Sequence, residues 1–417
     1  MSGTAAHAPP RLWPYPLVAG GVLFLGTLYN QWVIGARALP GSQAASRLAP
    51  DQAAGLLALG FLLQALLNPL VGSLGDRLRR RGGSRRGLIL VGAPLQALGF
   101  FAVWQPGSLA GAPVAAAILF TSAAMVLVNQ PWSALLPALA PEQRLRVRLS
   151  ALSGGCGLLG AVAALVAGPL LVERGGPAAL GPAGALTFLG LVLLPTLLLR
   201  EPPLRGAQGP AEGWALGGAG TLLRRRPVQR VIAAQGLLGL AVLSLTAVVP
   251  PAAAHLVQRP PVQLNAWLAG GMLAGPLLLG LLGDRLGPER LLGLAGVLGA
   301  GALLALTLLR PAAFAPWAAG LSLLGAVALL ALAVPPVLLA GLADQDGAAR
   351  EGLLFGLGGT ALCLGQATGS GLTGALLGAS PGPQELQRVL LGAAAALGLG
   401  ALVLLPAGLG HTPARVE

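Results

Sequence analysis

The chain has 417 residues, of which 55% are hydrophobic and only 9% are charged, and its mean hydropathy is +0.78. A soluble domain usually carries roughly 25% charged residues because its surface faces water, so this composition excludes an ordinary soluble globule and predicts the lipid bilayer as a partner. The net charge of +13 does not indicate a nucleic-acid partner, because the arginines cluster between apolar segments without interleaved aromatic residues.

A helix needs about 20 mostly apolar residues to cross a bilayer, and the sequence contains twelve such segments. The first six lie near residues 15–36, 53–74, 87–105, 113–138, 149–172 and 178–199. The other six lie near residues 229–250, 263–283, 290–309, 315–341, 352–378 and 386–407. We therefore predict an all-α membrane protein of twelve transmembrane helices. Its domains are an N-terminal six-helix half (1–199), a cytoplasmic linker rich in Gly, Pro and Arg (200–228) and a C-terminal six-helix half (229–417).

The arginines predict how the helices are oriented, because cytoplasmic loops carry an excess of basic residues. If both termini and the even-numbered loops are cytoplasmic, that side holds 20 of the 26 basic residues and the opposite side holds 6. This bias predicts a multi-pass protein of the cell (inner) membrane with both termini in the cytoplasm.

A short motif occurs once in each half. The sequence GSLGDR at residues 72–77 is matched by GLLGDR at residues 280–285, and the two aspartates are 284 − 76 = 208 residues apart, about half of the chain. Each copy joins two apolar segments, with further arginines following. A duplicated helical bundle with matching connections is typical of secondary transporters.

The motif residues are candidates for gating. The glycines let adjacent helices approach closely, the aspartate can accept hydrogen bonds at the end of a neighbouring helix, and the arginines can pair with acids of the facing half. Such contacts can form and break as the halves move. The alternative is that these are ordinary loop charges. The predicted gating residues are Asp76, Arg77, Arg81, Asp284, Arg285 and Arg290.

Both copies of the motif resemble the loop signature of the major facilitator superfamily. Three further stretches, residues 61–106, 129–144 and 335–378, resemble the glycoside–pentoside–hexuronide cation symporters, whose melibiose-permease branch is the best known. The resemblance covers about a quarter of the chain. It implies a twelve-helix fold with a central cavity, often for sugars or their glycosides, although lipid-carrying relatives exist.

The chain departs from that family where the cation is held. The family's membrane aspartates are replaced by Gln64, Asn68 and Asn129, and the lysine of its eleventh helix by Cys363. A cation site in a bilayer needs negatively charged oxygen ligands, and a proton relay needs a titratable group. The concerted loss of acids and lysine predicts a cavity for a neutral or amphipathic solute without the usual cation coupling, although main-chain oxygens leave Na⁺ coupling open.

The candidate substrate-binding residues are polar or aromatic side chains near the middle of the predicted helices. Amides and aromatic rings of this kind commonly bind sugars. The alternative is that they only hydrogen-bond neighbouring helices. The set is Tyr29, Asn30, Trp32, Gln64, Asn68, Asn129, Gln130, Trp132, Thr360, Cys363 and Gln366.

The predicted function is therefore a secondary transporter that moves a small polar or amphipathic solute, acting as a monomer. Two alternatives stay open: an exporter of lipophilic compounds, and a transporter-fold protein that no longer transports and instead assists assembly or senses a ligand. We expect no enzymatic activity, no cofactor and no metal site, because the three histidines and two cysteines are scattered.

Overall fold

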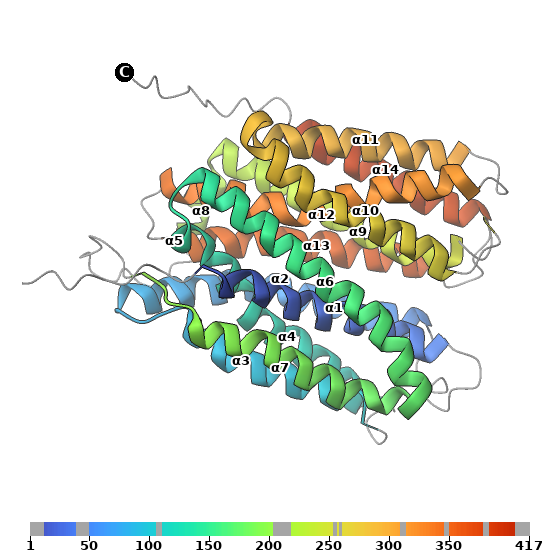
Figure 1. Cartoon of the computed structure of the whole chain (residues 1–417), viewed down its shortest axis with the longest axis horizontal. Helices are drawn as coiled ribbons and strands as arrows, with labels where there is room; N and C mark the ends of the chain where they lie inside the picture. The colour runs from blue at the N-terminus through green and yellow to red at the C-terminus, as the bar shows by residue number, and fades with distance from the viewer. Residues whose placement is uncertain are drawn as a thin grey trace, which may run out of the picture.

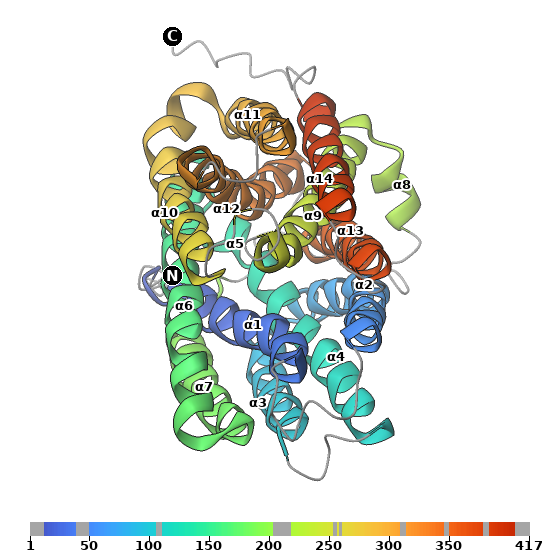
Figure 2. The ribbon, with the colours of Figure 1, turned by 90° about the vertical axis from the view of Figure 1, so that its right-hand side faces the viewer.

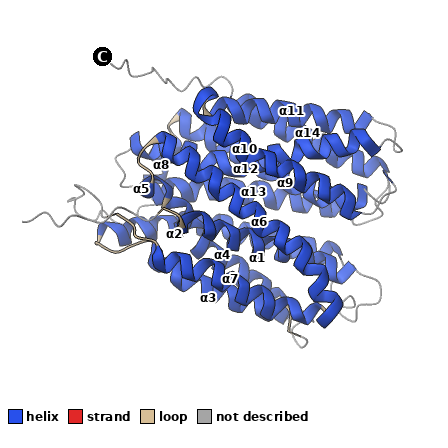
Figure 3. Cartoon of the chain, in the orientation of Figure 1, coloured by secondary structure: helices blue, strands red, loops and turns tan. Residues whose placement is uncertain are grey.

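The computed structural model is a bundle of helices that run roughly parallel to one long axis (Figure 1). It describes residues 12–38, 50–105, 111–202, 218–252, 257, 261–308, 314–345, 350–377 and 383–404. Within these ranges the regular elements are all helices (Figure 3). This confirms the predicted all-α fold.

The N-terminal half contains six long helices among the described residues. They are α1 (Pro14–Ala38), α2 (Pro50–Arg80), α3 (Arg86–Val103), α4 (Ala112–Ala134), α6 (Gln143–Gly175) and α7 (Leu180–Leu198), with the short α5 (Leu136–Leu139) after α4. The described part of the C-terminal half also contains six. They are α9 (Arg226–Ala252), α10 (Pro261–Leu286), α11 (Pro288–Leu308), α12 (Phe314–Gln345), α13 (Glu351–Leu377) and α14 (Pro383–Leu404). The short α8 (Ala219–Leu223) precedes α9. Over its described residues every predicted segment thus coincides with a helix. Ten of the described helices are long and apolar enough to cross a membrane.

The largest differences between the predicted and the observed helix boundaries lie at one end of the bundle. Helix α2 continues six residues beyond the predicted segment, and α6 begins six residues before it. The added turns are rich in arginine, which is a good helix former, so the helices continue where the apolar run stops. The first motif copy therefore forms the last turns of α2 and is not a loop. Gly82, with φ of 77°, follows that helix and allows the chain to reverse.

The two halves have the same internal packing. In the N-terminal half, α1 packs against α6 and α7, α3 against α4 and α7, and α2 against α4. In the C-terminal half, α9 packs against α13 and α14, α11 against α12 and α14, and α10 against α12. Each pair has its counterpart in the other half, as a duplicated architecture requires.

The halves meet mainly along two seams. Helices α2 and α13 lie side by side at one edge, and α6 lies beside α10 and α12 at the other (Figure 2). We call the end of the bundle that carries α5, α8 and the α2–α3 turn the latch end. Helices α2 and α13 stay in contact toward the opposite end, where the Ser370 hydroxyl donates to the carbonyl oxygen of Ala54 at 3.3 Å. Their backbones approach most closely near the latch end, at Gly72 and Gly352. The closest approach of the halves is therefore at the latch end.

Glycines on α13 let this helix lie between α2 and α9. A methyl group at Gly365 would overlap the carbonyl oxygen of Gly236 on α9. The Gly365→Ala variant is therefore expected to lose about 1–3 kcal/mol of stability, the usual range for overpacking. The Gly371→Ala variant is the control, because a methyl group there meets no atom within 4 Å. Thermal unfolding of both purified variants checks this; equal melting temperatures would contradict it.

Candidate functional site: an ion-pair latch between the two halves

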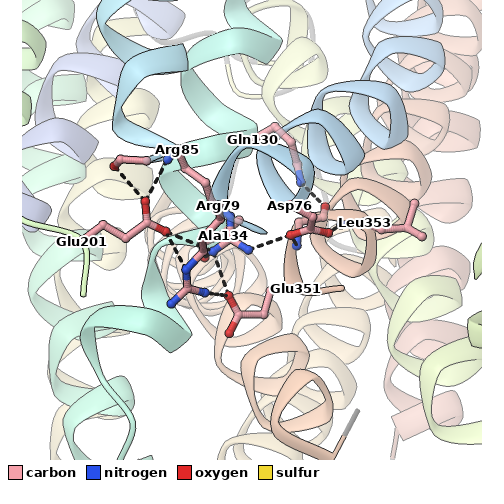
Figure 4. Close-up of polar contacts among 10 residues, drawn as sticks. Asp76, Arg79, Arg85, Gln130, Ala134, Glu201, Glu351 and Leu353 are labelled. Carbon is pink, nitrogen blue, oxygen red and sulfur yellow. Dashed lines mark hydrogen bonds and ion pairs between the residues drawn. The ribbon is translucent and has the colours of Figure 1, made fainter. Parts of the chain in front are cut away.

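Asp76, in the last turns of α2, binds the first turn of α13. Its Oδ1 atom accepts a hydrogen bond from the backbone N–H of Gly352 at 2.7 Å, and its Oδ2 atom accepts one from Leu353 at 2.9 Å. The first N–H groups of a helix have no partner within the helix, and they form the positive end of its dipole. A carboxylate of the N-terminal half thus caps a helix of the C-terminal half (Figure 4).

Arg85, in the turn after α2, links three carboxylates, although only 1% of its side chain is exposed. Its guanidinium donates to Asp76 at 2.7 Å, to Glu351 at 2.7 Å and to Glu201 at 3.4 Å. It also donates to the carbonyl oxygen of Ala134 at 2.9 Å. Burial lowers the pKa of the Arg85 guanidinium, but the three carboxylates outweigh this effect and hold the pKa above its ordinary value.

Arg79 lies one turn after Asp76 and bridges the other two acids. Its Nη1 atom is 2.6 Å from Glu351 Oε2, and its Nε atom is 3.2 Å from Glu201 Oε1. Glu351 is the first residue of α13, whereas Glu201 follows α7. The five side chains Asp76, Arg79, Arg85, Glu201 and Glu351, together with the first N–H groups of α13, form what we call the latch (Figure 4).

A second contact strengthens the junction near the latch. Gln130 of α4 donates from Nε2 to the carbonyl oxygen of Gly352 at 2.9 Å. Gly72 allows this approach, because a methyl group on it would overlap that same carbonyl oxygen. Side chains from α2, α4 and the α2–α3 turn thus converge on the first residues of α13.

The latch uses other arginines than the sequence predicts. Arg77 and Arg81 are exposed, whereas Arg79 and Arg85 make the ion pairs. Residues three apart lie on one face of a helix, so the spacing of Asp76 and Arg79 could have identified Arg79. Arg85 reaches the site only through the turn. Glu201 and Glu351 were missed, although both are acids directly beside apolar segments at the arginine-rich end.

The second copy of the motif lies at the end of α10. Arg285 and Arg290 are exposed, and the side chain of Asp284 lies outside the described residues. The end of α10 adjoins α6, since a Cβ atom at Gly283 would be 3.0 Å from Val147 Cγ1.

Helices α6 and α12 make a separate contact between the halves. Arg146 of α6 forms an ion pair of 2.6 Å with Asp344 of α12, whose side chain is half-exposed. Further along the same helix, Ser150 donates to the carbonyl oxygen of Ala333 at 2.6 Å. This second junction is therefore simpler and more exposed to solvent than the latch.

The predicted binding residues of α2 and α13 meet between the halves. Asn68 Nδ2 is 3.5 Å from Cys363 Sγ, which lies 3.9 Å from Gln64 Oε1. Thr360 donates to the carbonyl oxygen of Ala65 at 2.8 Å. All the side chains in these contacts are neutral. Two amides and a thiol thus meet where α2 and α13 join the halves.

The remaining predicted binding residues are more dispersed. Tyr29 is buried and donates to the carbonyl oxygen of Ile118 at 3.0 Å, within its own half. Trp132 donates to the carbonyl oxygen of Tyr15 at 3.2 Å and stacks on its ring. Asn30 is exposed, and the side chain of Trp32 lies outside the described residues.

Of two further predicted amides, one has a carbonyl oxygen without a hydrogen-bond partner in the described structure and the other lines a small cavity. The Oδ1 atom of Asn129 is buried without a hydrogen-bond partner in the described part of the structure. Gln366 lines a cavity of about 10 Å³ between α9, α12 and α13, close to the smallest volume that holds one water molecule. An unsatisfied buried acceptor such as Asn129 Oδ1 calls for a donor from water or a ligand.

Comparisons with known proteins agree with this architecture. The profile of the Major Facilitator Superfamily matches residues 17–370, while a search among curated proteins finds no sequence relative.

Three solved structures illustrate the similarity in fold. The human organic anion transporter MFSD10 superposes with a TM-score of 0.73 at 17% identity, over 94% of this chain and 98% of its own. The FucP transporter in its outward conformation, a fucose:proton symporter of E. coli, superposes with a TM-score of 0.67 at 17% identity, over 94% of this chain and 99% of its own. A bacterial homologue of the iron transporter ferroportin in its outward-facing state superposes with a TM-score of 0.69 at 18% identity, over 95% of this chain and 99% of its own. With the profile match spanning most of the sequence, the chain belongs to the Major Facilitator Superfamily.

Proposed function

We propose that this protein is a secondary transporter that moves a small, uncharged polar or amphipathic solute, favouring a sugar or glycoside, without cation coupling. The observation that carries the proposal is the contrast between the latch end and the middle of the α2–α13 seam. Charged, reversible contacts join the halves at the latch end, whereas neutral amides and a thiol lie further along the same two helices.

The latch suits an alternating-access mechanism. Its contacts across the halves are hydrogen bonds and ion pairs, which can exchange for water when the halves separate. Closure at the latch end corresponds to one of the two states that such a mechanism needs. Residues 1–199 and 229–417 are the proposed moving halves, and the arginine bias assigns the latch end to the cytoplasm.

The solute class rests on the neutral side chains. Gln64, Asn68 and Asn129 can exchange hydrogen bonds with hydroxyl groups, and the buried Oδ1 atom of Asn129 has an acceptor to offer. Resemblance to the glycoside–pentoside–hexuronide symporters supports a sugar-like solute, as does similarity in fold to a fucose:proton symporter. Replacement of that family's acids supports transport down a gradient.

The test is uptake into proteoliposomes of a labelled panel of sugars and glycosides, with and without imposed Na⁺ and proton gradients. We expect one class of solute to equilibrate across the membrane at a rate that neither gradient changes. Accumulation driven by a gradient would contradict the uncoupled mechanism. Absence of uptake for the whole panel would shift the assignment to export of lipophilic compounds or to a non-transporting role.

A further inference from the structure

The latch contains an odd number of charges, divided unequally between the halves. Asp76, Arg79 and Arg85 belong to the N-terminal half, and Glu201, at the start of the linker after α7, is held to that half by Ser84 and Arg85. Only Glu351 belongs to the C-terminal half. In the closed latch three carboxylates therefore share two guanidinium groups, and all five side chains are at most 7% exposed. When the halves separate, Glu351 leaves with α13. The N-terminal half then retains two carboxylates and two guanidinium groups.

Glu201 and Glu351 compete for the same two arginines. Glu201 lies 3.2 Å from Arg79 and 3.4 Å from Arg85, and Glu351 lies 2.6 Å and 2.7 Å from them. Like charges repel strongly in a buried site of low dielectric. The repulsion between these two acids exists only while the latch is closed.

Glu201 also continues to neutralise the positive charges of Arg79 and Arg85 after the latch opens. It is fixed to the N-terminal half, because it accepts hydrogen bonds from the hydroxyl of Ser84 at 2.9 Å and from the backbone N–H of Arg85 at 2.8 Å. If Glu201 were neutral and the halves separated, Asp76 would be the single acid among the latch residues that remain together. It would then have to balance the two positive charges of Arg79 and Arg85. A poorly compensated charge of this kind disfavours the open state.

We propose that Glu201 is a counterion that weakens the latch and so sets the balance between its closed and open states. Glu351 has the opposite effect, because it holds the halves together. This inference rests on the proposed alternating-access function, and it adds a residue whose charge limits how tightly one state is held.

The two neutral variants therefore have opposite expected effects. Glu201→Gln should raise the ratio of closed to open latch about tenfold, which corresponds to about 1.4 kcal/mol. Its amide oxygen can still accept from Ser84 and the Arg85 N–H, so these two anchoring contacts are kept. Glu351→Gln should lower the same ratio. If Glu201 only supported the structure of the latch, both variants would lower it.

The populations can be measured without a substrate. Nitroxide labels at Ala112 and Gln384, which are exposed at the ends of α4 and α14 opposite the latch, report the separation of the halves by pulsed electron paramagnetic resonance. Both native cysteines are first replaced by alanine, and every variant is compared in that background. The closed latch corresponds to the longer distance, so Glu201→Gln should increase its fraction.

Two further variants complete the experiment. In a Glu351→Gln background, Glu201→Gln should have almost no effect, because the competition needs both acids. Glu173→Gln, a change at an exposed acid far from the latch, should leave the distances unchanged. A fall in the closed fraction, or no change, with Glu201→Gln alone would overturn the inference. The label distances are measured without any solute, so they test the role of Glu201 independently of uptake. Failure of solute uptake would instead refute the proposed function.

Discussion

Asp76→Asn is expected to reduce the initial rate of solute transport at least about tenfold. Three N–H donors converge on the Asp76 carboxylate, from Gly352, Leu353 and Arg85. An asparagine has one acceptor oxygen, and its NH₂ group would face a donor. Hydrogen bonds to charged groups contribute roughly 1.5–3 kcal/mol each, and each 1.4 kcal/mol is about a tenfold change. Uptake into proteoliposomes at equal protein density measures the effect.

The Asp344→Asn variant is the comparison, since Asp344 also pairs with an arginine of the other half. Its side chain is 49% exposed, against 1% for Asp76, and exposed ion pairs contribute only about 0–1 kcal/mol. We expect a change of roughly fivefold or less for this variant. Equal losses in both variants would mean that burial does not distinguish the two junctions. A normal rate in Asp76→Asn would remove the latch from the transport cycle.

Gly72→Ala is expected to prevent full closure of the latch. The added methyl group would overlap the Gly352 carbonyl oxygen and lie 3.2 Å from Gln130 Nε2. Backbone cannot move aside as a flexible side chain does, so α2 and α13 must separate. The hydrogen bonds that Asp76 accepts from α13 then lengthen. Overpacking usually costs about 1–3 kcal/mol, so the ratio of closed to open latch reported by the Ala112–Gln384 label pair should fall about tenfold.

Gly55→Ala provides the matched control on the same helix. A methyl group at Gly55 meets no atom within 4 Å, and alanine favours a helix over glycine by about 1 kcal/mol. We expect unchanged label distances and an equal or slightly higher melting temperature. If Gly72→Ala also left the distances unchanged, the close approach of Gly72 and Gly352 would not limit closure.

The structure also changes how the duplicated motif is understood. The two copies have the same sequence pattern, but the described surroundings of the two halves differ. Asp76 lies in a buried network of five charged side chains, whereas in the Arg146–Asp344 pair near the second copy the aspartate is half-exposed. Among the described residues the two halves are thus joined at two places, by a network of five charged side chains near the first copy and by a single ion pair near the second. We expect the first to dominate the energy of closure.

Much of the fold could be predicted from the sequence alone. The apolar segments predict the twelve helices because a bilayer requires runs of about 20 apolar residues whose backbone bonds are satisfied internally. The duplication at Asp76 and Asp284 predicts two equivalent halves, and the arginine bias predicts their orientation. These are local or compositional properties, and each can be read without knowing which helices touch.

The partners within the site depended on the tertiary structure. Glu201 is 116 residues from Arg85, and Glu351 is 266 residues from it, so no local pattern relates them. The spacing of Asp76 and Arg79 places both on one face of α2, but only the packing of α2 against α13 decides that this face meets Glu351. The meeting of Asn68 with Cys363 likewise follows from packing of the two halves. Charge and polarity along a chain determine which residues need partners, but long-range helix packing decides which partners they find.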